Sequence, residues 1–124
     1  IGHGIDIEEV ERVRRLMDLP GSEWLTATFS ADERTIADPS PRHLEFYAGR
    51  FAAKEAIAKA LGTGFSGDLS WTDIEVLRQS TGAPAVRLSS AAAKQASALG
   101  ITQWLLSISH SEHFAIASAL ALGR

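Results

Sequence analysis

A long proline-free segment dominates the middle of the chain. It runs from Arg42 to Leu61, and Gly62 follows it, where a helix favours a residue that adopts positive φ without strain. We therefore expect one long α-helix here, rich enough in alanine to pack closely against its neighbours. Gly49 within this helix costs about 1 kcal/mol relative to alanine, which indicates close approach of another backbone or of a ligand.

Period-two patterns and helical spacings predict the other elements. In residues 1–7 three isoleucines alternate with Gly2, Gly4 and Asp6, which predicts a strand whose apolar face is buried and whose other face holds Asp6 beside two glycines. A short amphipathic helix follows and stops at Pro20. Ser30 and Glu33 form a capping-box pattern that opens a second brief helix.

The second half of the chain alternates between strand and helix patterns. We expect strands at 71–78 and 85–88, a helix at 89–100, and strands at 104–109 and 114–122. The order β-α-α-α-β-β-α-β-β predicts an α+β fold in which a mostly antiparallel sheet packs against the long helix. The length predicts a single domain over residues 1–124.

Composition excludes several classes of protein. The chain has no cysteine, so disulfides, thiol catalysis and cysteine-ligated metals are excluded. A net charge of −3 argues against general nucleic-acid binding but leaves room for local basic clusters that hold an anion. No apolar run approaches the roughly 18 residues of a membrane span, and the first residues do not resemble a signal peptide. We expect a cytoplasmic protein without a membrane partner.

Two carboxylates occupy unusual positions. Asp6 lies in a predicted strand beside glycines, an open space that a ligand or metal ion could enter; alternatively it caps the next helix together with Glu9. Glu55 lies on a rather apolar face of the predicted helix. The simplest ion-pair partner for its carboxylate is Lys59, one turn later. That pair leaves Arg50 and the neighbouring cations unexplained.

The charges around the long helix form a set that suits phosphate chemistry. Asp6 and Glu55 offer oxygen ligands for a hard cation such as Mg²⁺, which takes one or two protein carboxylates together with substrate phosphate oxygens. Arg50, Lys54 and Lys59 offer positive charge, and the glycines of residues 62–64 let backbone amides approach phosphate closely. An ordinary charged amphipathic helix remains the alternative interpretation.

Two further groups of side chains could contact substrates. His110 ends a predicted strand at a tight connection, where it could accept a proton, bind phosphate, or serve as a hydrogen-bonded structural histidine. Arg12, Arg14 and Arg15 lie on the first helix among glutamates. They form either a solvated face or a docking surface for an acidic partner.

Three ordered blocks connect these residues to a known family. They read "GHGIDIEEVERV", "AGRFAAKEAIAKALGTG" and "SISHSEHFAIASA", and "WTDIEV" with "TGAP" lies between the second and the third. Across nearly its whole length the chain resembles the holo-acyl-carrier-protein synthases, the small type of 4′-phosphopantetheinyl transferase. The resemblance implies Mg²⁺-dependent transfer of 4′-phosphopantetheine from coenzyme A to a serine of an apo acyl carrier protein, with release of adenosine 3′,5′-bisphosphate.

The resemblance also implies roles for particular residues. It assigns Mg²⁺ binding to Asp6 and Glu55, and catalysis to Asp6, Glu55, Lys59 and His110. It assigns coenzyme A binding to Arg50, Lys54, Lys59, Gly62, Gly64, Pro84 and His110. The base that takes the serine proton stays open between His110 and a metal-bound water.

The family is expected to form a homotrimer with coenzyme A at the subunit interface. Its first helix meets the acidic helix of the carrier protein, which makes Arg12, Arg14 and Arg15 candidates for that contact. Two other functions remain as alternatives: a non-catalytic coenzyme A or nucleotide-binding protein on the same scaffold, and a magnesium-dependent phosphohydrolase.

Overall fold

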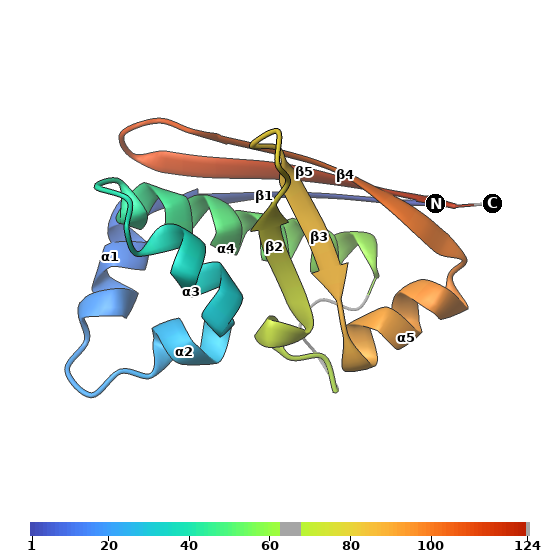
Figure 1. The fold of residues 1–124 in the computed structure, drawn as a ribbon, viewed down its shortest axis with the longest axis horizontal. Helices are drawn as coiled ribbons and strands as arrows, with labels where there is room; N and C mark the ends of the chain where they lie inside the picture. The colour runs from blue at the N-terminus through green and yellow to red at the C-terminus, as the bar shows by residue number, and fades with distance from the viewer. Residues whose placement is uncertain (63–67, 124) are drawn as a thin grey trace.

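The computed structural model describes residues 1–62 and 68–123, and its helices and strands form an α+β arrangement (Figure 1). The elements are, in order, β1 (Gly2–Glu9), α1 (Val10–Asp18), α2 (Trp24–Thr28), α3 (Ala31–Ala37), α4 (His43–Ala60), the 3-10 turn η1 (Trp71–Asp73), β2 (Ile74–Arg78), β3 (Pro84–Leu88), α5 (Ser90–Ala98), β4 (Ile101–His110) and β5 (Phe114–Gly123). The predicted α+β class is confirmed.

Two elements differ from the expectation at the N-terminal end. The strand β1 continues to Glu9, so Asp6 lies inside a strand and does not cap α1, which begins without a side-chain cap. The short helix α2 was not predicted, since its five residues lack a capping side chain. The capping box of Ser30 and Glu33 at the start of α3 is present as predicted.

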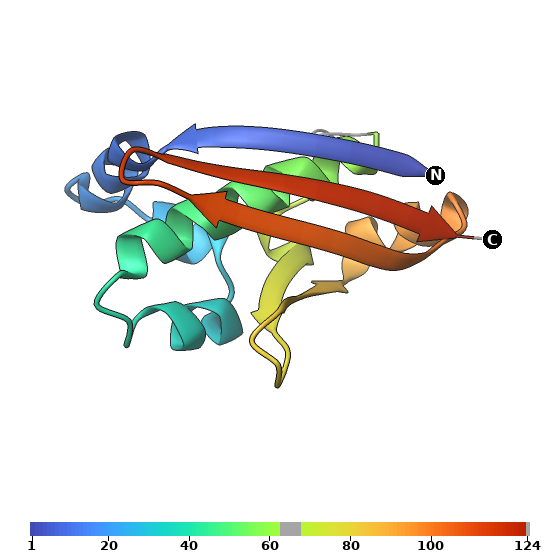
Figure 2. The ribbon, with the colours of Figure 1, turned by 90° about the horizontal axis from the view of Figure 1, so that it is seen from above.

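The strands form two antiparallel sheets. One has three strands in the order β1-β5-β4, and the other consists of β2 and β3. The long helix α4 runs along one face of the three-stranded sheet, on the same side as the other helices (Figures 1 and 2). The edge strands β1 and β4 therefore lie on opposite sides of β5.

The sheet face that meets α4 is built from very small side chains. Four alternate residues of β5 on this face are buried alanines: Ala115, Ala117, Ala119 and Ala121. On β1 the corresponding residues include Gly2 and Gly4, where an added Cβ would overlap the carbonyl oxygens of Ala60 and Ala56. The helix thus rests almost directly on the main chain of β1. We call this contact between α4 and the sheet the small-residue layer.

Gly49 meets a side chain rather than a backbone or a ligand. A Cβ added there would lie 2.9 Å from Cγ2 of Ile108 on β4. Ile108 is β-branched and stiff at χ1, so its side chain would have to shift to admit this Cβ, whereas at Gly4 the main chain of the helix would have to move. The sequence correctly predicted a close approach at Gly49 but not its nature.

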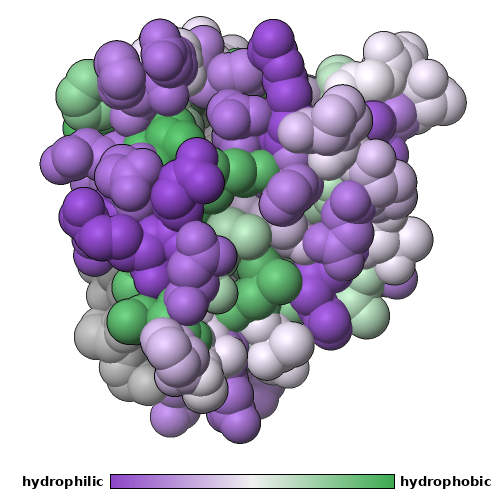
Figure 3. Space-filling model, turned by 90° about the vertical axis from the view of Figure 1, so that its left-hand side faces the viewer, coloured by the Kyte–Doolittle hydropathy of each residue, from purple (hydrophilic) through white to green (hydrophobic). Residues whose placement is uncertain are grey.

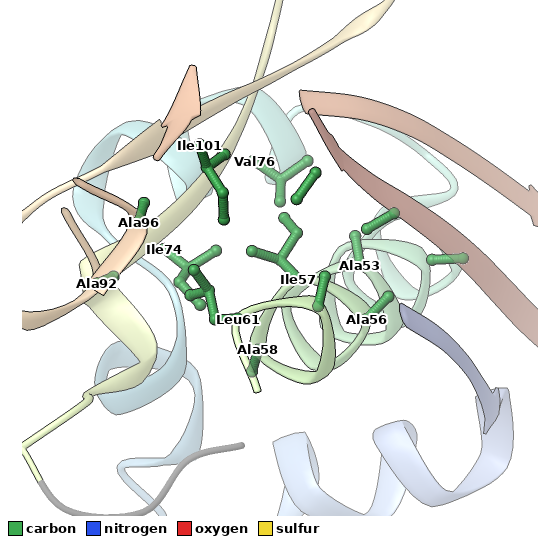
Figure 4. Packing of buried hydrophobic residues seen from close by; sticks show 14 of the residues in the cluster. Ala53, Ala56, Ile57, Ala58, Leu61, Ile74, Val76, Ala92, Ala96 and Ile101 are labelled. Carbon is green, nitrogen blue, oxygen red and sulfur yellow. The ribbon is translucent and has the colours of Figure 1, made fainter. Parts of the chain in front are cut away.

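The remaining core lies on the other side of α4. Ile57 and Leu61 pack against Ile74 and Val76 of β2 and against the alanines of α5 (Figure 4). A second cluster contains the buried aromatic side chains of Phe29, Tyr47 and Phe51. The helix α4 therefore packs against the three-stranded sheet on one side and against β2 and the short helices on the other.

The large apolar side chains of the three-stranded sheet point away from α4. Ile5 and Ile7 are 53% and 59% exposed, so the prediction that the isoleucine face of this strand is buried is wrong for a single chain. The small-residue layer explains the reversal, because only glycine fits between β1 and the helix. The exposed residues of this outer apolar face are Ile5, Ile7, Leu105, Phe114, Ile116, Leu120 and Leu122.

Among the described residues, no helix combines the length and the apolar character that crossing a bilayer requires.

Candidate active site

Asp6 and Lys59 meet where β1 crosses α4. The inner face of β1 directs Asp6 toward the helix, and Lys59 Nζ lies 3.1 Å from Asp6 Oδ1 and 2.9 Å from the carbonyl oxygen of Ile5. Within residues 1–62, Lys59 forms its ion pair with Asp6 and not with Glu55, so the alternative interpretation of an i,i+4 pair is wrong. The Lys59 side chain is half exposed and remains accessible to a substrate.

Asp6 belongs to a group of three interacting carboxylates. Burial and the charge of Asp6 raise the pKa of Glu55 above its ordinary value. Burial, a hydrogen bond to Asp6 and the charge of Asp6 raise the pKa of Glu8 to about 8. Glu8 is buried, and its Oε1 accepts a hydrogen bond from Arg12 at 2.9 Å. The negative charge concentrated here favours a cation.

Glu8 is a residue that the sequence analysis missed. It lies two positions after Asp6 on the same strand face, a spacing that is visible in the sequence. In the alternative interpretation, in which Asp6 caps the next helix, Glu8 would lie in that helix and not on the strand face. The continuation of β1 to Glu9 is what places Glu8 beside the other two carboxylates.

The chemistry of this group fits a magnesium ion. When the carboxylates are ionised, the buried Oδ2 of Asp6 has no hydrogen-bond partner among the described residues. A buried acceptor without a donor is costly unless a cation satisfies it. The described part of the chain offers no set of three or more ligating side chains arranged around one point. Asp6 and Glu55 would therefore share the ion with water and substrate oxygens, as Mg²⁺ prefers.

Arg50 and His110 lie together at a second location, on the β4 side of α4. They line a hollow of about 220 Å³ with Ser40, Arg42, Glu45, Phe46, Gly49 and Ile108. The Arg50 guanidinium stacks on the Phe46 ring, with Cζ 3.7 Å from the ring centroid. Burial and the charge of Arg78 lower the pKa of Arg50 to about 10, and its buried Nε has no hydrogen-bond partner in the described residues. This hollow has the charge and the free donors of an anion site.

The structure contradicts the predicted role of Lys54. Its side chain is fully buried, and its ammonium donates to Glu33 Oε1 at 2.8 Å, to the carbonyl oxygen of Trp71 at 3.0 Å and to that of Ile74. An ammonium has three donors, and all three have protein acceptors. Lys54 therefore stabilises the fold and does not contact coenzyme A phosphate in this arrangement.

The other predicted coenzyme A residues are more scattered. Gly62 has a φ of 81° and ends α4 as predicted, whereas Gly64 lies outside the described residues. Pro84 opens β3 and pairs with Arg78 in the two-stranded sheet. It therefore belongs to a different sheet from Asp6 and His110.

The three arginines of α1 are exposed. Arg12 and Arg14 form ion pairs with Glu8 and Glu11, and Arg15 lies in the last turn of the helix. The end of the molecule that carries α1 presents a largely hydrophilic surface with small apolar patches (Figure 3). Because Arg12 contacts Glu8, this surface is continuous with the carboxylate group around Asp6.

Comparison with known proteins connects this geometry to a family. A family model described as the 4′-phosphopantetheinyl transferase superfamily matches residues 2–118. A holo-[acyl-carrier-protein] synthase from Desulforudis audaxviator is 43% identical over 99% of this chain and 93% of its own length.

Solved structures agree with this match. The holo-(acyl-carrier-protein) synthase of Bacillus anthracis, in complex with CoA (3′,5′-ADP), is 36% identical with a TM-score of 0.80 over 98% of this chain and 95% of that one. The Helicobacter pylori enzyme in complex with coenzyme A is 30% identical with a TM-score of 0.84, over 97% and 99% of the two chains. The chain therefore belongs to the 4′-phosphopantetheinyl transferase superfamily.

Proposed function

We propose that this protein is a holo-acyl-carrier-protein synthase, with residues 1–124 forming one transferase domain. It transfers 4′-phosphopantetheine from coenzyme A to a serine of an apo acyl carrier protein. The observation that carries this assignment is the group of Asp6, Glu55 and Lys59 around a buried oxygen of Asp6, which has no donor among the described residues when the carboxylates are ionised, in a chain that belongs to the superfamily.

The reaction is a phosphoryl transfer with a simple balance. The serine oxygen attacks the phosphorus that carries the pantetheine arm, and the bond from that phosphorus to the bridging oxygen breaks. Adenosine 3′,5′-bisphosphate leaves, and the serine proton passes to a base, either His110 or a water molecule. The protein must hold the pyrophosphate in place and compensate its charge.

Asp6 and Glu55 would hold a Mg²⁺ ion, which when bound supplies positive charge against the pyrophosphate. The raised pKa of Glu55 supports this, because a cation relieves the repulsion among these carboxylates. Lys59 is held by Asp6 and by the carbonyl oxygen of Ile5, and its half-exposed ammonium can donate to a phosphate oxygen. Arg50 and His110 would bind another phosphate of coenzyme A in their hollow.

Two features support a homotrimer. The outer apolar face leaves large side chains in water that a second copy would cover. Asp6 and His110 also lie on opposite edge strands of one sheet, so a neighbouring copy can bring the two halves of the site together. The exposed arginines of α1 are the proposed contact for the acidic carrier protein, and we assign the protein to the cytoplasm with these substrates.

The decisive experiment is intact mass spectrometry of an apo acyl carrier protein incubated with this protein, coenzyme A and Mg²⁺. We expect a mass gain of one phosphopantetheine, which EDTA abolishes. If carriers stay unmodified while coenzyme A binds, the protein is a non-catalytic binding scaffold. Release of free phosphopantetheine without any carrier would indicate a phosphohydrolase.

A further inference from the structure

Glu8 connects the strand that carries Asp6 to the helix that carries the exposed arginines. It is the last residue but one of β1, and its side chain is 9% exposed. Its Oε1 accepts a hydrogen bond from Nη1 of Arg12 at 2.9 Å, and its carboxyl group is also hydrogen-bonded to Asp6. This buried side chain therefore contacts both a proposed metal ligand and a proposed carrier-binding arginine.

Arg12 and Arg14 differ in the partner that each one has. Arg14 pairs with Glu11 at 3.2 Å, and both side chains are more than half exposed, so water screens this pair. Arg12 is 55% exposed, whereas its partner Glu8 is buried. The Arg12 guanidinium thus reaches from the solvent to an interior charge. It has five N–H donors, so it can keep its contact with Glu8 and still donate to a carboxylate of another protein.

The charge of Arg12 acts on the whole carboxylate group of Asp6, Glu8 and Glu55. Burial is the main cause that raises the pKa of Glu8 and of Glu55, and the charge of Arg12 opposes the rise at both. Arg12 therefore compensates part of the negative charge of this group. The same positive charge disfavours a further cation beside these carboxylates.

We propose that Glu8 is a positioning residue that couples the docking of an acidic carrier protein to the binding of the metal ion. This inference rests on the proposed function. Glu8 holds the Arg12 guanidinium beside the carboxylate group. When a carboxylate of the carrier contacts Arg12, it compensates the guanidinium charge, and the carboxylate group then binds a divalent cation more tightly.

The coupling is reciprocal, so a bound cation must favour carrier docking by the same factor. A cation that compensates the carboxylate group leaves more of the Arg12 charge available to the carrier. The site would therefore bind its cation most tightly when the protein that supplies the serine is in place.

The test measures the dissociation constant of Mn²⁺ by electron paramagnetic resonance. It is measured with and without a saturating apo carrier protein whose acceptor serine is replaced by alanine, and coenzyme A is left out, so that no transfer takes place. The proteins compared are the wild type, Glu8→Gln, Arg12→Gln and Glu11→Gln. Glu11→Gln is the matched control, because it removes the same charge from the exposed pair with Arg14. Circular dichroism and sedimentation confirm that each variant keeps the fold and the oligomeric state.

We expect the carrier to tighten Mn²⁺ binding to the wild type by about fivefold or more, a common size for coupling between two sites. Glu8→Gln should remove most of this effect. Arg12→Gln should bind Mn²⁺ without the carrier nearly as tightly as the wild type binds it with the carrier. Glu11→Gln should keep the wild-type factor. A substitution that only loosened the fold would weaken Mn²⁺ binding equally with and without the carrier.

Calorimetry gives the reciprocal measurement. The dissociation constant of the same carrier is determined with and without saturating Mg²⁺, and the ratio for the wild type should be similar to the ratio found with Mn²⁺. In Glu8→Gln the two carrier constants should nearly coincide.

Two results would overturn the inference. Mn²⁺ could bind the wild type equally well with and without the carrier, or Glu8→Gln could keep the full wild-type factor, which would indicate a general attraction between carrier and cation. Either result leaves the proposed transfer intact if the wild type still modifies an apo carrier in the presence of coenzyme A. A wild-type protein that neither binds nor modifies any carrier contradicts the proposed function and this inference together.

Discussion

Lys54 of α4 and Glu33 of α3 form an ion pair with an Nζ to Oε1 distance of 2.8 Å, and their side chains are 0% and 2% exposed. The second carboxylate oxygen of Glu33 accepts a hydrogen bond from the backbone nitrogen of Val76 at 2.9 Å. The pair therefore joins α3, α4 and β2 in the interior. Burial alone lowers the pKa of Lys54, and the charge of Glu33 opposes that shift.

Removal of Lys54 should destabilise the protein without acting through substrate binding. Lys54→Met leaves the buried charge of Glu33 without its partner, and we expect a loss of about 3–5 kcal/mol in the free energy of unfolding. Urea denaturation measures this loss, with the exposed Lys94→Met as the control. Unchanged stability combined with weaker coenzyme A binding would instead restore the sequence-based prediction that Lys54 binds phosphate.

Substitution of either proposed metal ligand should reduce the response to Mg²⁺. At limiting Mg²⁺ we expect Asp6→Asn and Glu55→Gln to lower the transfer rate by about a hundredfold or more, since several kcal/mol of charge stabilisation are lost. Mn²⁺ binding followed by electron paramagnetic resonance gives an independent measurement. Glu9→Gln, which alters an exposed carboxylate of the same strand, is the matched control. Full activity of Glu55→Gln at limiting Mg²⁺ would rule out the metal assignment.

The raised pKa of Glu8 predicts a pH-dependent stability of the metal-free protein. Its pKa rises from an ordinary value of 4.5 to about 8, so the folded state binds more protons than the unfolded state between these values. Stability from this group is therefore lost as the pH rises through that window. Thermal unfolding in EDTA between pH 5 and about 8.5 should show a steeper fall for the wild type than for Glu8→Gln.

Glu55 remains in the Glu8→Gln variant, and its own raised pKa contributes a fall of the same sign. The comparison is therefore the difference between the two curves and not their absolute slope. Glu9→Gln should follow the wild-type curve. Parallel curves for the wild type and Glu8→Gln would contradict the carboxylate group described here.

Gly4→Ala should lower the free energy of unfolding far more than the addition of one methyl group suggests. The new Cβ would overlap the carbonyl oxygen of Ala56, a backbone atom that moves only with the helix. We expect a loss of about 3 kcal/mol or more, at the upper end of overpacking effects. His3→Ala, on the exposed face of the same strand, should change stability little. Equal melting temperatures for the two variants would argue against the small-residue layer.

The outer apolar face predicts self-association. Ile116→Lys places a charge in the middle of this face and should shift the protein from trimer to monomer in analytical ultracentrifugation. Leu19→Lys introduces the same charge at an exposed leucine after α1 and should leave the assembly unchanged. A wild-type protein that sediments as a monomer at all concentrations would contradict the trimer.

Local patterns predicted most of the fold. Absence of proline and a following Gly62 predicted α4, and alternation predicted both strands of the C-terminal hairpin, because these signals depend on neighbours in sequence. The buried face of β1 was not predictable in the same way. Alternation is equally compatible with either face inside, and the decision depends on the close approach of α4, a tertiary contact.

The candidate site was predictable to a similar degree. The sequence indicated that Asp6, Glu55 and Lys59 belong together, and the structure brings Lys59 to Asp6 and lets Asp6 act on Glu55. It could not indicate that Lys54 turns inward, because the partner Glu33 lies on another helix. The prediction that Glu8 belongs to the site would have depended on where the strand ends and the helix begins, and element boundaries are the least certain part of a prediction from sequence.

The small-residue layer has a consequence for how the site keeps its shape. Asp6 and Glu55 extend from two main chains that touch, with no large side chain between strand and helix whose rotamer could change their separation. The backbone geometry of β1 and α4 therefore sets the spacing of the two carboxylates. Substitutions in the aromatic core or on the surface can accumulate while this spacing persists, whereas one methyl group added between β1 and α4 displaces both carboxylates at once.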